Sequence, residues 1–152
     1  MTLCRPATAL LPPFLLVLLY WPALGWSACD DPPARRVNWL HCDKQGIDLQ
    51  GADLREAVLT QVNLTGVKLT NARLSGADLG GATLGRADFS GAALVGTRLV
   101  SAKLEQAIFA NASMAGARLE RATLTQANLS NAEWSGARSD RAGLAAGEWG
   151  GA

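Results

Sequence analysis

Few residues of this chain have the side chains that enzymes use for catalysis. The single histidine, His41, stands beside Cys42, and the other two cysteines are Cys4 and Cys29. An adjacent histidine and cysteine could supply a base and a thiolate nucleophile. Without a second histidine or a cluster of carboxylates, however, neither a zinc site nor a Ser/His/Asp triad can be assembled. We therefore expect His41 to be structural, and we predict a protein without enzymatic activity, metal or cofactor.

The second group of residues that could bind a ligand is a set of arginines in the C-terminal half. Glu120 and Asp140 stand among them. The arginines recur every 20 residues in two series, Arg98, Arg118 and Arg138, and Arg121 and Arg141. If the fold stacks residues 20 apart, these guanidinium groups form a ladder that could bind a polyanion such as lipid phosphate or an acidic glycan. The alternative is a solvated ladder of surface salt bridges without a ligand.

The element that must position these side chains follows from a sequence rule of period five. From Ile47 onward, a large apolar residue occupies every fifth position, beginning with Leu49 and ending with Trp134. Two positions before each of them stands a small or β-branched residue, nearly always alanine, and Thr97 is the polar exception. A pattern of this length indicates a repeated structural unit.

Neither regular secondary structure accommodates a period of five. On an α-helix, successive large residues would be rotated by roughly 140° and would share no face. On a straight strand, every other large residue would point to the wrong side. A chain that turns a corner after each short extended piece can direct all of them into one interior. Glycine and asparagine, which tolerate the positive φ of tight turns, stand two positions after many of the large residues. These corner residues are Gly51, Gly66, Asn71, Gly76, Gly81, Gly91, Gly96, Asn111, Gly116, Asn131 and Gly136.

Several five-residue units carry a family resemblance. Residues 52–56 (ADLRE), 77–81 (ADLGG) and 127–131 (ANLSN) resemble the A-(D/N)-L-x-x unit of pentapeptide-repeat proteins. The resemblance covers nearly all of the chain after the N-terminal segment. It implies an all-β fold, a right-handed quadrilateral β-helix, with four pentapeptides per coil and with Leu, Phe and Ala inside.

Four units per coil imply that residues 20 apart lie on the same side of neighbouring coils. Phe89 and Phe109 should then form an aromatic pair inside the solenoid, which would contribute roughly 1 kcal/mol beyond burial. Asp48, Lys68 and Asp88 should form an external column of alternating charge, each contact worth a few tenths of a kcal/mol.

The first 25 residues have the features of an export signal. Arg5 is the only charged residue before Trp26, and an interrupted apolar stretch follows it. Ala23 and Gly25 are small residues at the −3 and −1 positions of a cleavage site. The unbroken apolar run is shorter than the about 20 residues that a membrane span needs. We therefore predict a signal peptide at 1–25 and an exported bacterial protein, periplasmic or secreted, without a membrane span after signal removal. An uncleaved anchor is the alternative.

The cysteines also favour export. Removal of the signal would take Cys4 away and leave Cys29 and Cys42, an even number in an oxidising compartment. A disulfide between them would close a loop of about 14 residues and add roughly 3 kcal/mol of stability. There is an alternative, because Trp26 and the three residues that follow it partly resemble a lipoprotein cleavage box. Cleavage after Ala28 would then leave a lipidated Cys29 as the membrane anchor.

The pattern divides the chain into four parts. After the signal peptide we expect an N-terminal cap at 26–46, closed by the Cys29–Cys42 hairpin. The regular β-helix should occupy 47–138, and degenerate repeats with a C-terminal tail should occupy 139–152. Exposed strand edges at the ends of such a solenoid make oligomers through the ends possible.

The overall charge limits the possible functions. The chain has 14 Lys and Arg and 13 Asp and Glu, so loss of Arg5 with the signal leaves 13 of each and no net charge. Neutrality argues against non-specific attraction to nucleic acid, and equally against an acidic mimic of DNA. We predict a non-catalytic structural or interaction module of the cell envelope, which presents a rigid surface to an unknown protein or an envelope polyanion. The resemblance implies an alternative, since some pentapeptide-repeat proteins mimic DNA and protect topoisomerases; that role requires a cytoplasmic location and an acidic face.

Overall fold

The computed structural model describes residues 29–145 and 147. The predicted signal peptide, both of its expected cleavage sites and the last predicted repeat centre, Trp149, lie outside the described residues.

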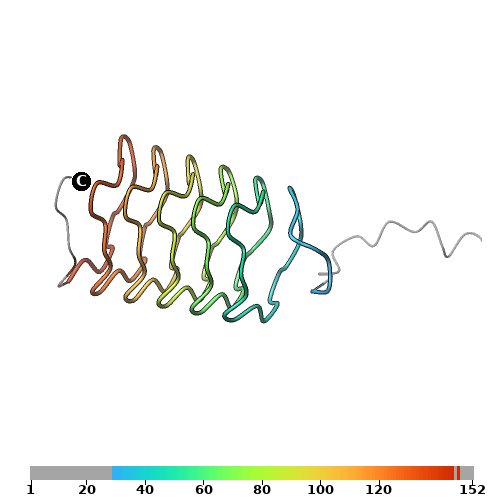
Figure 1. The fold of residues 1–152 in the computed structure, drawn as a ribbon. Coiled ribbons are helices and arrows are strands. Elements are labelled where there is room, and N and C mark those ends of the chain that lie inside the picture. Colours follow the sequence, from blue (N-terminus) through green and yellow to red (C-terminus); the bar gives the residue numbers. More distant parts are fainter. Residues whose placement is uncertain (1–28, 146, 148–152) are drawn as a thin grey trace, which may run out of the picture.

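The described residues wind into a solenoid of stacked coils (Figure 1). They contain no helix and no extended strand, and their regular elements are isolated parallel β-bridges between residues 20 apart. The first bridge joins Asn38 to Val58, and the last joins Thr123 to Gly143. Each bridge residue stands one position before the centre of a repeat, so four repeats make one coil. The structure therefore confirms the right-handed quadrilateral β-helix.

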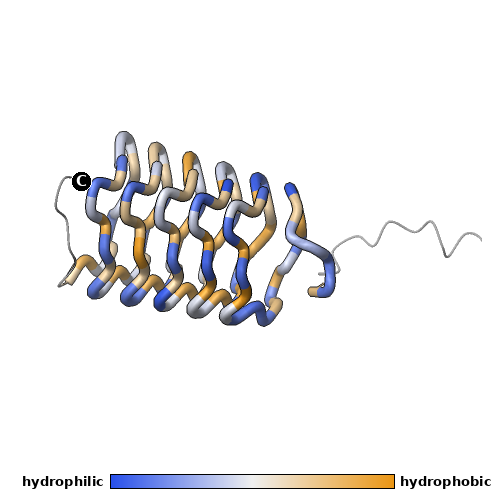
Figure 2. Tube along the Cα trace, in the orientation of Figure 1, coloured by the Kyte–Doolittle hydropathy of each residue, from blue (hydrophilic) through white to orange (hydrophobic). Residues whose placement is uncertain are grey.

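The interior of the solenoid is a single apolar column. All repeat centres from Leu54 to Leu129 are fully buried, and so are the small residues that precede them. Polar and apolar residues alternate along every coil (Figure 2). Full burial of one leucine side chain contributes about 1.5–3 kcal/mol, which makes the column the main source of stability. Thr97 lies in this column because its hydroxyl donates a hydrogen bond of 2.9 Å to the carbonyl of Leu74.

Every corner of the solenoid has the same turn. The N–H of Ala52, for example, donates to the carbonyl of Leu49 across 3.0 Å. The third residue of the turn has positive φ at every corner from Arg36 to Arg141, as in a type II turn. The eleven predicted glycine and asparagine corners are confirmed. The sequence did not indicate that Glu, Gln, Arg, Ser and His adopt the same conformation elsewhere.

Hydrogen bonds between coils hold these unfavourable corners in place. The left-handed conformation costs a non-glycine residue about 1–2 kcal/mol. At Glu56, where φ is 58°, the N–H donates to the carbonyl of Ser75 on the next coil across 3.1 Å. The same bond forms at Gln61, whose N–H donates to the carbonyl of Gly80. Pairing with the neighbouring coil therefore overrides the local preference of the residue.

The acidic or amide residue of the repeat has a defined local role. A side-chain oxygen of each Asp or Asn at a bridge position accepts a hydrogen bond from the N–H two residues later, as in the 3.0 Å bond between Gln50 and Asp48. The bond satisfies a turn N–H that no neighbouring coil reaches. The residues that form it are Asn38, Asp43, Asp48, Asp53, Asn63, Asp78, Asp88 and Asn128.

The two predicted stacks have different outcomes. The rings of Phe89 and Phe109 are stacked with centroids 4.7 Å apart, so the internal aromatic pair is confirmed. Asp48, Lys68 and Asp88 do lie in one column of bridges. No ion pair joins them among the described residues, because Asp48 and Asp88 accept hydrogen bonds within their own turns instead.

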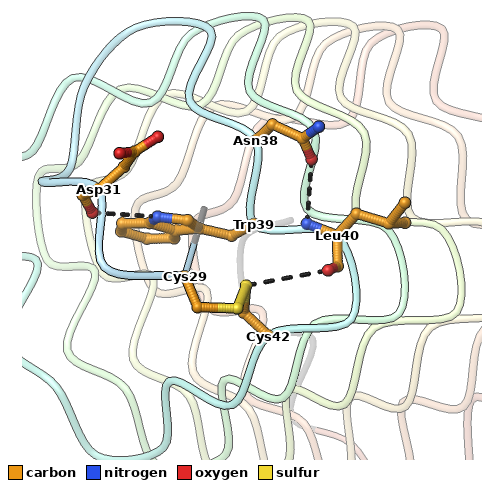
Figure 3. Close-up of a disulfide and its surroundings, with 6 residues drawn as sticks. All are labelled: Cys29, Asp31, Asn38, Trp39, Leu40 and Cys42. Carbon is orange, nitrogen blue, oxygen red and sulfur yellow. Dashed lines mark hydrogen bonds between the residues drawn. A yellow bond between two sulfur atoms is a disulfide. The ribbon is translucent and has the colours of Figure 1, made fainter. Parts of the chain in front are cut away.

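The N-terminal end of the solenoid is covered by a cross-linked cap. Cys29 and Cys42 form a disulfide, with their Cα atoms 5.5 Å apart (Figure 3). Beside it Trp39 is 1% exposed, and its indole N–H donates to the carbonyl of Asp31 across 3.1 Å. The ammonium of Lys44 lies 4.7 Å from the centre of the same ring. The disulfide and the buried indole together close this end of the apolar column.

The solenoid extends to both sides of the expected repeat segment, 47–138. The repeated turn already begins at Arg36, so the segment predicted as a cap contains the first coil. At the other end the last bridge reaches Gly143, although the centres Ser139 and Leu144 are exposed. The described part of the chain contains no helix that could cross a membrane.

Candidate functional site

The structure brings the five predicted arginines to one side of the solenoid, which we call the arginine face. Parallel bridges join Arg98 to Arg118 and Arg118 to Arg138, so these three lie on consecutive coils about 4.8 Å apart. Arg121 and Arg141 occupy the corners at one edge of this face, with φ of 62° and 59°. All five residues are exposed.

Only two of the five arginines are paired with carboxylates. A guanidinium nitrogen of Arg98 lies 3.0 Å from a carboxylate oxygen of Asp78, and Nε of Arg118 lies 3.1 Å from Oε1 of Glu120. Within the described residues, no ion pair involves the remaining three. Most of the guanidinium donors on this face are therefore available to a ligand. The unpaired arginines are Arg121, Arg138 and Arg141.

Glu120 orients the central arginine. Its side chain is only 18% exposed, and its Oε2 is buried without a hydrogen-bond partner. The pKa of Glu120 is lowered, first by a hydrogen bond from its own backbone N–H and then by Arg118 and Arg138, although burial opposes the shift. Glu120 is therefore ionised at neutral pH. It holds Nε of Arg118 and leaves the terminal nitrogens of that side chain for other contacts.

A shallow hollow of about 290 Å³ adjoins the arginines. It exists because Gly80 lacks a side chain at a position where the neighbouring coils carry Thr60 and Val100. A Cβ on Gly80 would come within 3.1 Å of Oδ1 of Asp78 and 3.9 Å of Cγ2 of Thr60. The sequence analysis missed this hollow; the available signal was a glycine with larger residues 20 positions before and after it. The lining residues are Thr60, Asp78, Gly80, Arg98, Val100 and Arg118.

The edge of the arginine face opposite Arg121 has no side chains. Its corners are Gly96, Gly116 and Gly136, which are exposed and have positive φ. A ligand can therefore approach the arginines from this edge without a steric barrier. The face is a basic strip that runs along the solenoid axis.

The other residues with potential chemistry are not assembled into a site. His41 is an exposed corner residue of the first coil, and Cys42 is held in the disulfide. No group of three or more His, Cys, Asp or Glu residues in the described part of the chain could hold a metal ion. The arginine face with its hollow is therefore the candidate site.

Comparison with known protein families gives a match over most of the chain. The family described as pentapeptide repeats matches in eight copies, at residues 45–81, 72–110, 87–126 and 109–138. No curated protein sequence matches the chain.

Two solved structures are similar to this solenoid. One is a pentapeptide repeat protein from the cyanobacterium Cyanothece 51142, which is 25% identical with a TM-score of 0.60; the match covers 74% of this chain and 90% of that protein. The other is a pentapeptide repeat protein from the thylakoid lumen of Arabidopsis thaliana, 30% identical with a TM-score of 0.59. That match covers 60% of this chain and 63% of the plant protein.

Proposed function

Because this chain belongs to the pentapeptide-repeat family, we propose that it is an exported, non-catalytic interaction module of the bacterial cell envelope. In this role the solenoid is a rigid support, and the arginine face is the surface that a partner binds. The observation that carries the proposal is the position of five arginines and an adjoining hollow on one side of a fully packed β-helix.

The rigidity of the support favours binding over catalysis. The repeat centres are fully buried, and the corners are held by hydrogen bonds between coils. A surface of this kind presents its side chains at fixed spacings, which reduces the entropy lost when a partner binds. The hollow is lined by arginine, threonine, valine, glycine and aspartate side chains. These residues suit recognition by charge and hydrogen bonds, and they include no pair of nucleophile and base.

Three observations support export. The N-terminal segment has the order of charged, apolar and small residues that is typical of a signal peptide. The Cys29–Cys42 disulfide is the kind of bond that persists in oxidising compartments. The plant relative, which is 30% identical over the matched region, is a protein of the thylakoid lumen, and this compartment is also outside the cytoplasm.

Fractionation of cells that produce the full chain with a C-terminal epitope tests the location. We expect the mature protein in the periplasm or medium, with the mass of a chain that begins at Trp26. A variant without residues 2–25 is the matched control and should stay in the cytoplasm. A mass that corresponds to a lipidated Cys29 would indicate a lipoprotein. Cytoplasmic recovery of the uncleaved chain would contradict export and favour the topoisomerase-protecting role.

Site-specific crosslinking in intact cells tests the binding surface. A photoreactive residue at Val100, on the arginine face, should capture a partner. The same residue at Ala110, which has the equivalent position on the opposite side, should capture none. Both positions are half-buried. Equal products from the two positions, or none from either, would contradict the proposed surface.

A further inference from the structure

The spacing of the arginines indicates a ligand that extends along the solenoid. Arg98, Arg118 and Arg138 form a straight series of parallel bridges, with one guanidinium on each coil. Their separation along the axis is about 4.8 Å per coil. A compact anion would contact only one or two of them. A linear polymer with an acidic group on successive units can contact all three in turn.

The acidic residues among the arginines limit how densely charged the ligand can be. Asp78, Glu120 and Asp140 stand on the same face, and their carboxylates would repel closely spaced phosphates. A carboxylate can, however, accept hydrogen bonds from hydroxyl groups. Oδ1 of Asp78 accepts one bond from the N–H of Gly80, which leaves it capacity for another. This combination suits a polymer that carries both acidic groups and many hydroxyls.

The hollow offers space for a neutral part of such a polymer. It has a hydroxyl at Thr60, an apolar group at Val100 and a carboxylate at Asp78. The rings of polysaccharides present apolar C–H faces and hydroxyl edges, and both kinds of group find a counterpart here. The guanidinium groups of Arg98 and Arg118 line the same hollow. An acidic group on the neighbouring sugar unit would therefore lie within their reach.

We infer that the arginine face binds a linear acidic polysaccharide lengthwise, with its carboxylate or sulfate groups on Arg98, Arg118 and Arg138 and a sugar ring in the hollow beside Gly80. The inference names the partner class of the proposed interaction module and rests on that function. A vesicle surface and a protein partner are the outcomes that the test must separate from it.

Binding of the disulfide-bonded chain from Trp26 onward to heparin and to polygalacturonate provides the first test. Heparin supplies sulfate groups, and polygalacturonate supplies carboxylates. Replacement of Arg118→Gln together with Arg138→Gln should weaken binding by about tenfold or more, because two charge-assisted contacts are lost. The matched control is Lys68→Gln with Arg86→Gln, which removes the same charge elsewhere and should change binding less than about twofold. Equal losses in the two variants would reduce the effect to net charge and overturn the inference.

The hollow provides a second test that leaves the charge unchanged. Gly80→Leu fills the hollow, and Gly85→Leu adds the same side chain at the equivalent turn position on the next side of the coil. Neither glycine has positive φ, so both variants should fold, which circular dichroism can check. We expect Gly80→Leu to weaken polysaccharide binding by about tenfold, as expected when a contact of about 1.4 kcal/mol is lost. Unchanged affinity in this variant would contradict a sugar in the hollow.

Vesicles of phosphatidylglycerol and phosphatidylcholine separate the inference from a membrane role. Retention on these vesicles without binding to either polysaccharide would overturn it. A protein crosslinked at Val100, in the absence of polysaccharide binding, would also overturn it but would leave the proposed interaction module intact. Conversely, polysaccharide binding by a chain that is not exported would contradict the proposed location and leave the binding site standing.

Discussion

Phe89 and Phe109 lie on neighbouring coils with their ring planes inclined by only 1° and their centroids 4.7 Å apart. The solenoid imposes this parallel arrangement, because residues 20 apart occupy equivalent positions on a nearly translational repeat. All other described centres of the five complete coils, except those at the two ends, are leucine or methionine. The aromatic pair is therefore the largest local departure from a uniform column.

Truncation of one ring should destabilise the protein strongly. We expect Phe109→Ala to lower the free energy of unfolding by about 3–5 kcal/mol, as is usual for a buried aromatic residue. Phe109→Leu should cost less, about 1 kcal/mol, because leucine fits the other centres. Urea denaturation measures both values. A double-mutant cycle with Phe89→Leu should show a coupling of about 0.5–1.5 kcal/mol, and strictly additive losses would contradict a stabilising ring contact.

Glycine at a strained corner should stabilise the fold. Ser101 has φ of 58°, a conformation that costs a residue with a side chain about 1–2 kcal/mol. We expect Ser101→Gly to raise the free energy of unfolding by about 0.5–1 kcal/mol, since glycine also has more freedom in the unfolded chain. Ser75→Gly is the matched control at a turn position without positive φ, and it should be neutral or destabilising. The same gain at both positions would refute the role of φ.

The stability of the N-terminal coils should decrease in acid through Asp53. The hydrogen bonds from the Arg55 guanidinium lower the pKa of Asp53 from 3.8 to about 2, against partial desolvation. Because the folded pKa lies below the unfolded one, the stabilisation is complete above about pH 4 and disappears as the pH falls towards 2. Asp53→Asn should flatten this part of the stability profile. Asparagine can still accept the turn hydrogen bond, as Asn63 and Asn128 do. Melting curves between pH 2 and pH 6 that are identical for the two proteins would contradict the prediction.

Reduction of the disulfide should destabilise the capped end. The bond joins residues 13 apart, and a loop of this size contributes about 3 kcal/mol in the chain-entropy account. We expect dithiothreitol to lower the midpoint of urea unfolding for the native protein. A Cys29→Ser, Cys42→Ala variant should start at the lower midpoint and be insensitive to dithiothreitol. A native protein that unfolds at the same urea concentration with and without reductant would show that the cap adds no stability.

The local pattern was sufficient to predict the interior and many of the corners. A leucine at every fifth position, such as Leu54 and Leu59, is compatible with burial only if the chain turns between them. The glycine at position 51 indicated where one such turn lies. The pairing of Phe89 with Phe109 additionally required the number of repeats per coil, which came from the family resemblance.

The details of the surface could not be predicted in the same way. Asp48 was expected to pair with Lys68, but its carboxylate accepts a hydrogen bond from its own turn, because that donor is closer and otherwise unsatisfied. The same competition directs Arg118 to Glu120 two residues away rather than to another coil. The hollow beside Gly80 depends on side chains 20 residues before and after it, so it belongs to three coils at once.

The sequence by itself determined which side chains are buried, because a strict period of five leaves a chain of apolar residues only one way to avoid water. It also placed the arginines at intervals that any fold with four repeats per coil must stack. Only the tertiary structure decided that residues such as Glu56 and Arg121 adopt positive φ, that two arginines are paired and three are not, and that a hollow opens beside them. The physical reason is that burial is specified residue by residue, whereas backbone strain, ion pairing and surface shape depend on which atoms the neighbouring coils bring within reach.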